Sequence, residues 1–288
     1  MELKYLKYEV SDGILLLTLN QPEVMNAVNA GTCAELTAAF DYADNDDRVR
    51  VIIVTGEGRA FCAGANLSDN SNREAIINGL AGEADIAPHR DDGGVVCLRI
   101  YDMKKPVIAA INGPAVGFGI TLTLPMDVRI AVKGAKMGFV FARRGIILDG
   151  AATWFLPRLV GMGVAAEWVY SGRVFSAQEA YDKRLVSELV EPEELITRAR
   201  EIAAGIANNS SAISVALCRQ MMWKMLGADH PMEAHILESR ALNWIYGEKD
   251  VQEGVASFLE KRPARFPMKT STDMPGFYPW WEERPFRP

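Results

Sequence analysis

Short apolar runs alternate with glycine-containing turns along the first two thirds of the chain. The segment Tyr5–Leu19 contains two such runs around Asp12-Gly13, a dipeptide typical of a tight turn, and is predicted as a β-hairpin. Further runs rich in β-branched residues predict buried strands at Val49–Thr55, Val107–Ile111 and Val128–Val132, with a helix from about Ala30 to Tyr42. Strand, turn and helix recur, which predicts an α/β layered core rather than a helical bundle or a β-sandwich.

The pattern changes after Leu185, where strand signals stop. Amphipathic helical periodicity follows at Glu193–Ala207, Ser211–Leu226, Met232–Tyr246 and Val251–Lys261. The last stretch, Pro267–Pro288, is rich in proline and aromatic residues, and it is too apolar for a free linker, so we expect it to dock. We therefore divide the chain into a core (1–200), a helical subdomain (201–266) and a tail (267–288).

Composition narrows the classes of partner. The 288 residues carry 31 Lys+Arg and 37 Asp+Glu, a net charge of -6, which argues against nucleic acid and membrane surfaces as partners. The longest apolar tract, Val107–Val132, contains prolines and charged residues that a membrane-spanning helix would not tolerate. No signal or transit segment is visible, and the four cysteines are scattered, so we expect a cytoplasmic protein with reduced thiols.

The sequence does not match the common catalytic and cofactor-binding motifs. Gly56-Glu57-Gly58 follows a strand, but Phe61 replaces the third glycine of a dinucleotide-binding turn. There is no phosphate-binding G-x-x-x-x-G-K and no G-x-S-x-G. His230 and His235 are five positions apart and do not share the helix face that metal ligands need. No metal site is predicted.

Two turns of small residues remain as candidate chemistry. Ala60–Leu67 follows one predicted buried strand, and Pro114–Ile120 follows the next. Glycine and alanine leave backbone N–H groups uncovered, and two converging N–H groups form an oxyanion hole. Taken alone, each turn is more often a simple tight connection than a functional site.

Taken in order, these and other segments resemble the crotonase superfamily, the enoyl-CoA hydratase/isomerase family. The resemblance covers about Leu15 to Phe266. Its segments are Asn20-Gln21-Pro22 with Asn26-Ala27, Ala60–Leu67, Ile111–Gly119, Asp127–Ala131, Phe155–Gly161, Ser176–Ala180 and Phe258–Arg262. It implies a crotonase-like spiral of ββα repeats, followed by a helical C-terminal subdomain that builds homotrimers, often paired into hexamers.

The resemblance also implies an acyl-CoA thioester substrate, with coenzyme A as part of the substrate and no separate cofactor. The N–H groups of Ala65 and Phe118 would hold the thioester oxygen. Residues of two turns, and of the last helix of a neighbouring subunit, would bind coenzyme A. These are Asn26, Ala27, Val28, Ala63, Asn66 and Leu67, and then Phe258 and Lys261, although Lys261 is equally well explained as a solvated helix end.

One departure from the family pattern bears on the reaction. Hydratases of this family use two glutamates whose positions match Thr121 and Phe141 here, so hydration by the usual pair is not expected. Asp149 resembles the single acid of Δ3,Δ2-enoyl-CoA isomerases, and the aspartate of dienoyl-CoA isomerases and of 4-chlorobenzoyl-CoA dehalogenase. We therefore expect a shift of a double bond with Asp149 as proton shuttle, while Asp149-Gly150 read alone is a turn dipeptide.

Three alternatives stay open: a hydratase in which Asp149 activates water, a hydrolytic enzyme in which Asp149 attacks as nucleophile with His89 as base, and an inactive acyl-CoA-binding scaffold. The substrate pocket is expected to include Thr121, Phe141, Arg144 and Trp154. Asp127 and Arg129 are interpreted as a structural ion pair.

Overall fold

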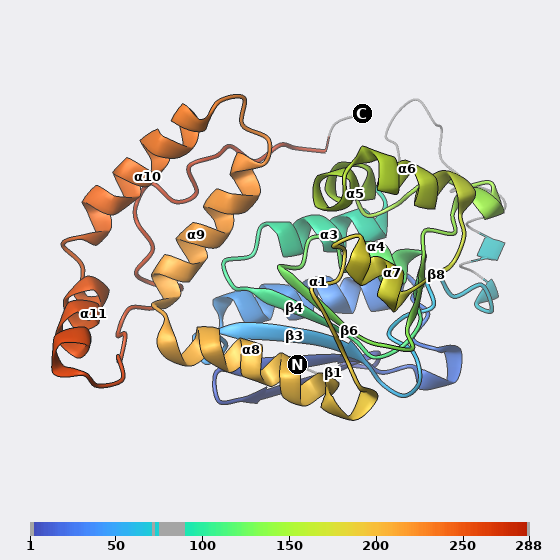
Figure 1. The fold of residues 1–288 in the computed structure, drawn as a ribbon, viewed down its shortest axis with the longest axis horizontal. Coiled ribbons are helices and arrows are strands. Elements are labelled where there is room, and N and C mark those ends of the chain that lie inside the picture. Colours follow the sequence, from blue (N-terminus) through green and yellow to red (C-terminus); the bar gives the residue numbers. More distant parts are fainter. Residues whose placement is uncertain (1–2, 71–72, 75–89, 287–288) are drawn as a thin grey trace.

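A parallel sheet with one antiparallel edge forms the centre of the molecule. The computed structural model describes residues 3–70, 73–74 and 90–286. Within these ranges six strands form the large sheet in the order β1-β2-β3-β4-β6-β9, in which β1 and β2 are antiparallel and every other pair is parallel (Figure 1). They are β1 (Leu6–Ser11), β2 (Ile14–Leu19), β3 (Val51–Gly56), β4 (Val107–Ile111), β6 (Val128–Val132) and β9 (Glu188–Val190). A smaller sheet contains β5 (Ala115–Val116), β7 (Lys136–Gly138) and β8 (Phe175–Ser176).

The local signals of the sequence agree with these strands. Asp12 and Gly13 turn the β1–β2 hairpin with φ angles of 52° and 76°, the positive values that a two-residue hairpin turn requires. The hairpin and the predicted strands β4 and β6 are confirmed, and β3 begins two residues later than predicted. The sequence did not predict β9, because three residues are too few to show a strand period; its pairing with β6 defines it.

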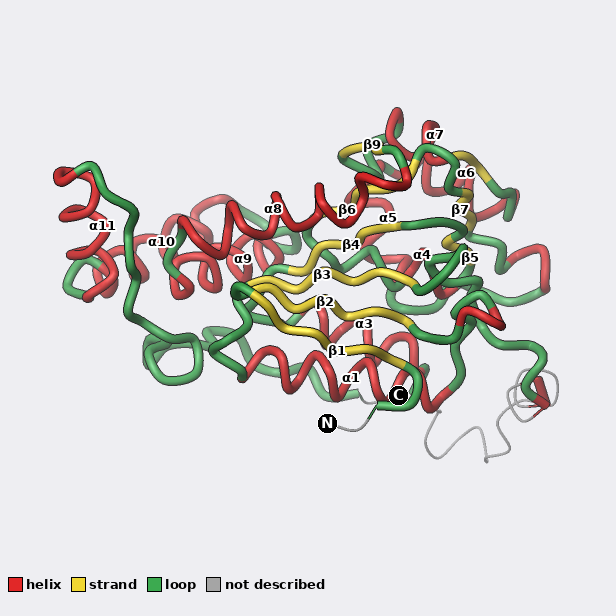
Figure 2. Tube along the Cα trace, turned by 90° about the horizontal axis from the view of Figure 1, so that it is seen from below, coloured by secondary structure: helices red, strands yellow, loops and turns green. Residues whose placement is uncertain are grey.

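Helices cover both faces of the large sheet. α1 (Ala30–Asn45) and α3 (Asp92–Tyr101) pack together on one face, and α8 (Leu195–Asn209) lies along the other (Figures 1 and 2). Because α8 packs on β2, β3, β4 and β6, the expected domain boundary at residue 200 falls inside an element of the core. The connecting helices are α4 (Phe118–Thr121), α5 (Ala152–Val160), α6 (Met162–Ser171) and α7 (Ala177–Asp182), with 3-10 turns at Pro22–Val24, Ala142–Arg144 and Pro192–Glu194.

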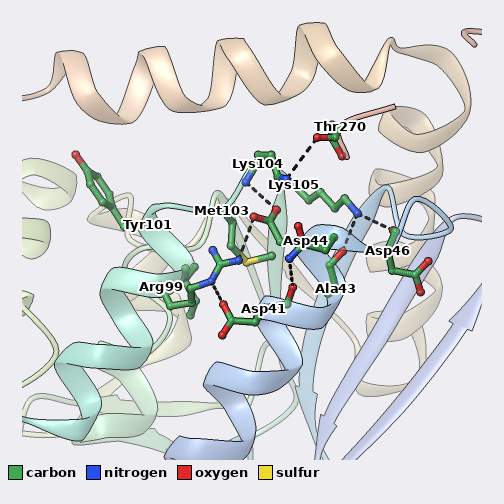
Figure 3. A network of polar contacts seen from close by, with 12 residues as sticks. Asp41, Ala43, Asp44, Asp46, Arg99, Tyr101, Met103, Lys104, Lys105 and Thr270 are labelled. Carbon is green, nitrogen blue, oxygen red and sulfur yellow. Dashed lines mark hydrogen bonds and ion pairs between the residues drawn. The ribbon is translucent and has the colours of Figure 1, made fainter. Parts of the chain in front are cut away.

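A polar network closes the C-terminal end of α1 (Figure 3). The buried Lys105 ammonium donates to the carbonyl oxygens of Ala43 and Asp46, at 2.7 Å each, and so ties the loop before β4 to the C-terminal end of α1. Burial lowers the pKa of Lys105 to about 8. Asp44 accepts from the Lys104 backbone N–H at 2.9 Å and from Arg99 of α3 at 3.0 Å. The network therefore joins α1, α3 and the loop before β4.

The C-terminal helices extend from the core as an arm (Figure 1), formed by α9 (Ala212–Met225), α10 (Pro231–Ile245) and α11 (Lys249–Glu260). Arg219 of α9 anchors the arm, because its Nε lies 2.9 Å from Asp127 Oδ2. The expected Asp127–Arg129 ion pair is therefore wrong: buried Arg129 instead donates to backbone carbonyls, including those of Met126 and Leu185. None of the helices in the described ranges is long and apolar enough to cross a membrane.

The tail docks against the arm and the core, as expected. Met268 is buried in a small apolar cluster with Ile213 and Leu217 of α9. The Lys224 ammonium lies 3.9 Å from the ring centroid of Tyr101 and 4.2 Å from that of Trp281, so it bridges α3 and the tail. Such contacts between a cation and aromatic faces are stabilising by about 0.5–2 kcal/mol each.

Candidate active site

The two turns of small residues lie side by side at the C-terminal ends of β3 and β4. The N–H groups of Phe61 and Cys62 donate to the carbonyl of Pro114 at 3.1 and 3.0 Å, and the Val116 N–H donates back to Cys62 at 3.0 Å. Neighbouring parallel strands place the turns that follow them at one edge of the sheet, which is why segments 50 residues apart meet here.

Within the described residues, the two N–H groups expected to hold the thioester oxygen are not used by the turns themselves. The Val28 N–H donates to the carbonyl of Gly64 at 2.8 Å, and the Gly117 N–H donates to that of Gly138 at 2.9 Å. The N–H groups of Ala65 and Phe118 come next in each turn, and within the described part of the chain neither donates a backbone hydrogen bond. A Cβ at Gly64 would lie 3.7 Å from the Phe118 nitrogen, so the turns approach closely at this point.

Asp149 lies beside the second turn. Its Oδ1 accepts a hydrogen bond of 2.6 Å from the hydroxyl of Thr121, the last residue of α4. Burial, together with the charge of Asp91, raises the pKa of Asp149 to about 6, although the Thr121 hydrogen bond opposes the shift. The carboxyl group is therefore a stronger base than an exposed aspartate, and it is still mostly ionised at neutral pH.

A second carboxylate, Asp91, is a residue that the sequence reasoning missed. It is the N-cap of α3 and accepts from the N–H groups of Gly93 at 3.1 Å and Gly94 at 2.7 Å. Its Oδ2 also accepts from the N–H of Gly150, at 3.1 Å. The signal was present in the sequence, because an aspartate just before a helix that opens with glycines is a typical N-cap.

Cysteine thiols form part of the surroundings of Asp149. The Cys97 thiol donates to the carbonyl of Thr121 at 3.7 Å, and a Cβ at Gly150 would lie 3.0 Å from its sulfur. Burial raises the pKa of Cys33 and Cys62 to about 12 and that of Cys97 well above its ordinary value, so all three are neutral thiols. All four cysteines of the chain are free, as expected.

Two of the segments expected to bind coenzyme A, 26–28 and 63–67, lie next to each other. Val28 and Ala65 form a parallel bridge, and the Ala63 N–H donates to the carbonyl of Met25 at 3.0 Å, so the segments 26–28 and 63–67 run side by side. The side chain of Asn26 is occupied within the fold, because its amide donates to the carbonyls of Glu57 and Ala60. Ala27 and Val28 are buried, whereas Leu67 is exposed. Any contact of Asn26 with a ligand therefore involves its backbone.

Phe258 and Lys261 are not brought to this site within one chain. Phe258 is 81% exposed on α11, and Lys261 follows at the end of that helix with φ 53°. Figures 1 and 2 both show α11 at the far end of the arm, away from α4 in the core. These two residues are therefore available to a neighbouring molecule rather than to Asp149 of their own chain.

The four expected pocket residues have different surroundings. Thr121 contacts Asp149 directly, and Phe141 is buried at the start of a 3-10 turn. Arg144 is exposed and donates to the carbonyl of Val140 at 3.2 Å. Trp154 packs edge-on against Tyr101, at 5.7 Å between ring centroids, in an aromatic cluster near the other end of α3. His89, the expected base of the hydrolytic alternative, lies outside the described residues.

Comparisons with known proteins agree with this architecture. The sequence profile of the enoyl-CoA hydratase/isomerase family matches residues 9–269. An enoyl-CoA hydratase from Alternaria alternata is 41% identical over 89% of this chain and 83% of its own length. A 1,2-epoxyphenylacetyl-CoA isomerase from Escherichia coli K12 is 31% identical over 92% of this chain and 98% of its own length.

Solved structures show the same fold. A probable enoyl-CoA hydratase/isomerase from Mycobacterium abscessus superposes with a TM-score of 0.82 at 33% identity, over 92% of this chain and 99% of that one. A putative enoyl-CoA hydratase from Streptomyces coelicolor A3(2) superposes with a TM-score of 0.83 at 29% identity, over 92% of this chain and 95% of that one. The chain therefore belongs to the enoyl-CoA hydratase/isomerase family and has the crotonase fold of acyl-CoA enzymes.

Proposed function

We propose that this enzyme shifts the double bond of an enoyl-CoA thioester from C3–C4 to C2–C3. The N–H groups of Ala65 and Phe118 hold the thioester oxygen, and Asp149 removes a proton from C2. The resulting enolate is stabilised by the two amides, and Asp149 returns the proton at C4. The observation that carries the proposal is the half-buried carboxyl group of Asp149 beside a turn whose Phe118 N–H donates no backbone hydrogen bond within the described residues.

The protonation behaviour of Asp149 supports this role. A shuttle must accept a proton in one step and release it in the next, and it does so best when its pKa lies near the working pH. Burial raises the pKa of Asp149 to about 6, which meets that requirement. Each fixed amide donor typically contributes about 3–4 kcal/mol to stabilising the developing oxyanion, because it is oriented before the charge forms.

The replacement of both hydratase glutamates supports the double-bond shift over hydration. By the family resemblance, Thr121 and Phe141 match the two hydratase glutamates, and neither side chain can act as a base at neutral pH. The Escherichia coli relative is named a 1,2-epoxyphenylacetyl-CoA isomerase, so one similar sequence is named for an isomerisation of a CoA thioester. A double-bond shift needs one proton carrier and no water, and Asp149 can serve as that carrier.

The experiment is turnover of a 3-enoyl-CoA, followed by the absorbance of the conjugated 2-enoyl product and by mass spectrometry. We expect wild-type turnover, its loss in Asp149→Ala and Asp149→Asn, and unchanged binding of coenzyme A by calorimetry in both variants. Full turnover by Asp149→Ala would refute the assignment.

Hydration is the second candidate, because similar proteins such as the Alternaria alternata and Rhodobacter capsulatus relatives are named as an enoyl-CoA hydratase and a probable one. In that reaction Asp149 activates a water molecule. Crotonyl-CoA as substrate distinguishes hydration from the double-bond shift, because hydration removes the enoyl absorbance of this thioester and adds the mass of one water. An acyl adduct on Asp149 in quenched enzyme would instead identify the hydrolytic mechanism, and binding without any turnover would identify a scaffold.

We also propose that the chain acts as a homotrimer, alone or paired into a hexamer, in which α11 of one subunit supplies Phe258 and Lys261 to the coenzyme A of the next. The support is the exposure of apolar side chains along the arm, including 81% for Phe258 and 72% for Leu259. Light scattering after gel filtration measures the assembly. The variant Phe258→Asp is expected to yield smaller species and to raise the KM for the acyl-CoA.

A further inference from the structure

The hydroxyl of Thr121 lies between two acceptors. Its Oγ1 is 2.6 Å from Asp149 Oδ1 and 3.2 Å from the carbonyl oxygen of Phe118. A hydroxyl has one proton and donates to one acceptor at a time. An ionised carboxylate is the stronger acceptor and forms the shorter bond, so the proton points to Asp149 while Asp149 is charged.

This contact distinguishes the two oxygens of the carboxylate. Thr121 is fully buried on α4, so its hydroxyl is held in place and fixes the rotation of the Asp149 carboxyl group through Oδ1. Oδ2 is then the oxygen that exchanges a proton with the substrate. The second acceptor belongs to Phe118, whose N–H is the proposed thioester donor, so the same hydroxyl links the base to the oxyanion turn.

We infer that Thr121 is a positioning residue for the proton shuttle: its hydroxyl donates to Oδ1 of Asp149, more strongly when the carboxylate is charged than when Oδ2 carries the proton, and so fixes the orientation of the carboxyl group. The inference rests on the proposed function. In the first step the C2 proton moves to Oδ2, and the C–H electron pair enters the enolate. In the second step the proton on Oδ2 moves to C4, which regenerates the carboxylate. The Thr121 proton stays on Oγ1 throughout.

The electrostatic surroundings allow this effect to be measured. Asp91 faces Asp149 from the start of α3, and the thiols of Cys33, Cys62 and Cys97 face it from α1, from the turn after β3 and from α3. The thiols are neutral over the relevant pH range. Removing the Thr121 hydroxyl therefore leaves Asp149 with the burial and the Asp91 charge that raise its pKa, and without the hydrogen bond that lowers it.

The test compares Thr121→Val, which keeps the shape and removes the hydroxyl, with Thr121→Ser, which keeps the hydroxyl. Thr123→Val is the matched control, because Thr123 is equally buried and its hydroxyl donates to the carbonyl of Ile120 at 2.8 Å, away from Asp149. For Thr121→Val we expect a plateau kcat lowered by roughly 10- to 100-fold, the factor of one hydrogen bond to a charged group, with KM unchanged. The acid limb of its pH profile moves to higher pH.

Thr121→Ser is expected to restore the wild-type pH profile and most of kcat, and Thr123→Val is expected to leave both unchanged. The carboxyl carbon resonance of Asp149, assigned by its absence in Asp149→Asn, reports the same pKa change without turnover and with folding monitored in the same sample. An unaltered pH midpoint in Thr121→Val, by either method, overturns the inference. If Asp149→Asn retains full turnover, the proposed function itself is wrong. This outcome is distinct from an unaltered pH midpoint in Thr121→Val, which contradicts only the role of Thr121.

Discussion

Asp91 accepts the backbone N–H of Gly150 through Oδ2 at 3.1 Å, although the two residues are 59 positions apart in the chain. The same carboxylate caps α3, so the turn that carries Asp149 is attached to the start of that helix. Gly150 itself has φ 62°, a conformation that favours glycine and holds the turn in shape. The location of Asp149 therefore depends on a helix cap as well as on its own segment.

Replacing Asp91 with asparagine is expected to move the acid limb of the pH profile to lower pH. The charge of Asp91 raises the pKa of Asp149, and asparagine removes that charge while it remains a good N-cap. The measurement is kcat/KM against pH with a 3-enoyl-CoA. Asp92→Asn is the control, because Asp92 lies in the same first turn and makes no hydrogen bond to Gly150. Equal shifts in both variants would show a general charge effect instead.

Turnover by the wild-type enzyme is expected to rise with pH around pH 6 and to level off above it. Asp149 must be ionised to accept the C2 proton, and burial raises its pKa to about 6. A profile of kcat/KM measured in buffers of constant ionic strength gives the midpoint. A midpoint near the ordinary aspartate value would contradict the burial of this carboxyl group in the free enzyme.

The variant Asp149→Asn is expected to be more stable than the wild type at neutral pH while it loses turnover. The folded pKa of about 6 lies above the ordinary 3.8, so the contribution of this group to stability is fully present below the unfolded pKa and is lost as pH rises through 6. The loss is on the order of 3 kcal/mol at most, and a neutral amide avoids it. Urea unfolding at acidic and neutral pH measures the difference, and a gain that is equal at both would exclude this explanation.

Gly64→Ala is expected to lower kcat/KM strongly by disturbing the oxyanion turn. Gly64 has φ 93°, and a Cβ there would lie 2.9 Å from the carbonyl oxygen of Val116. The backbone must move, and the N–H groups of Ala65 and Phe118 move with it; loss of one such donor costs about 100- to 1000-fold in kcat. Gly134→Ala is the control, because a Cβ at Gly134 meets nothing within 4 Å. Similar kinetics for both variants would place the oxyanion donors elsewhere.

Trp281→Ala is expected to lower the free energy of unfolding by about 1–3 kcal/mol without changing KM. The ring lies 4.2 Å from the Lys224 ammonium and packs edge-on against Tyr278 and Trp280, at 5.4 and 4.9 Å between ring centroids. Phe286→Ala is the comparison, since Phe286 is 55% exposed and stacks on Arg90 alone among the ring and cation contacts of the described chain. Denaturant titration of both variants compares the two contacts, and equal losses would show that the Trp281 contacts stabilise the fold no more than the exposed Phe286–Arg90 contact.

The sequence by itself determined the elements and the family. The runs of apolar residues and the residues typical of turns located the β1–β2 hairpin, β4 and β6, because these signals act over a few neighbouring residues. The motifs at Ala60–Leu67 and Pro114–Gly119 pointed to the two turns that the fold brings together. Asp149 was identified as the lone acid near them, and its role stays a prediction.

Only the tertiary structure decided the partners of these residues. Asp127 binds Arg219, far along the chain, rather than Arg129 two positions away, because the strand turns Arg129 into the core while α9 packs across the end of the sheet. In the same way, Thr121 and Asp91 come to Asp149 from α4 and α3 through contacts that span 28 and 59 positions. Hydrogen bonds depend on distance in space, so a local pattern predicts an element but not which side chain will meet another across the sheet.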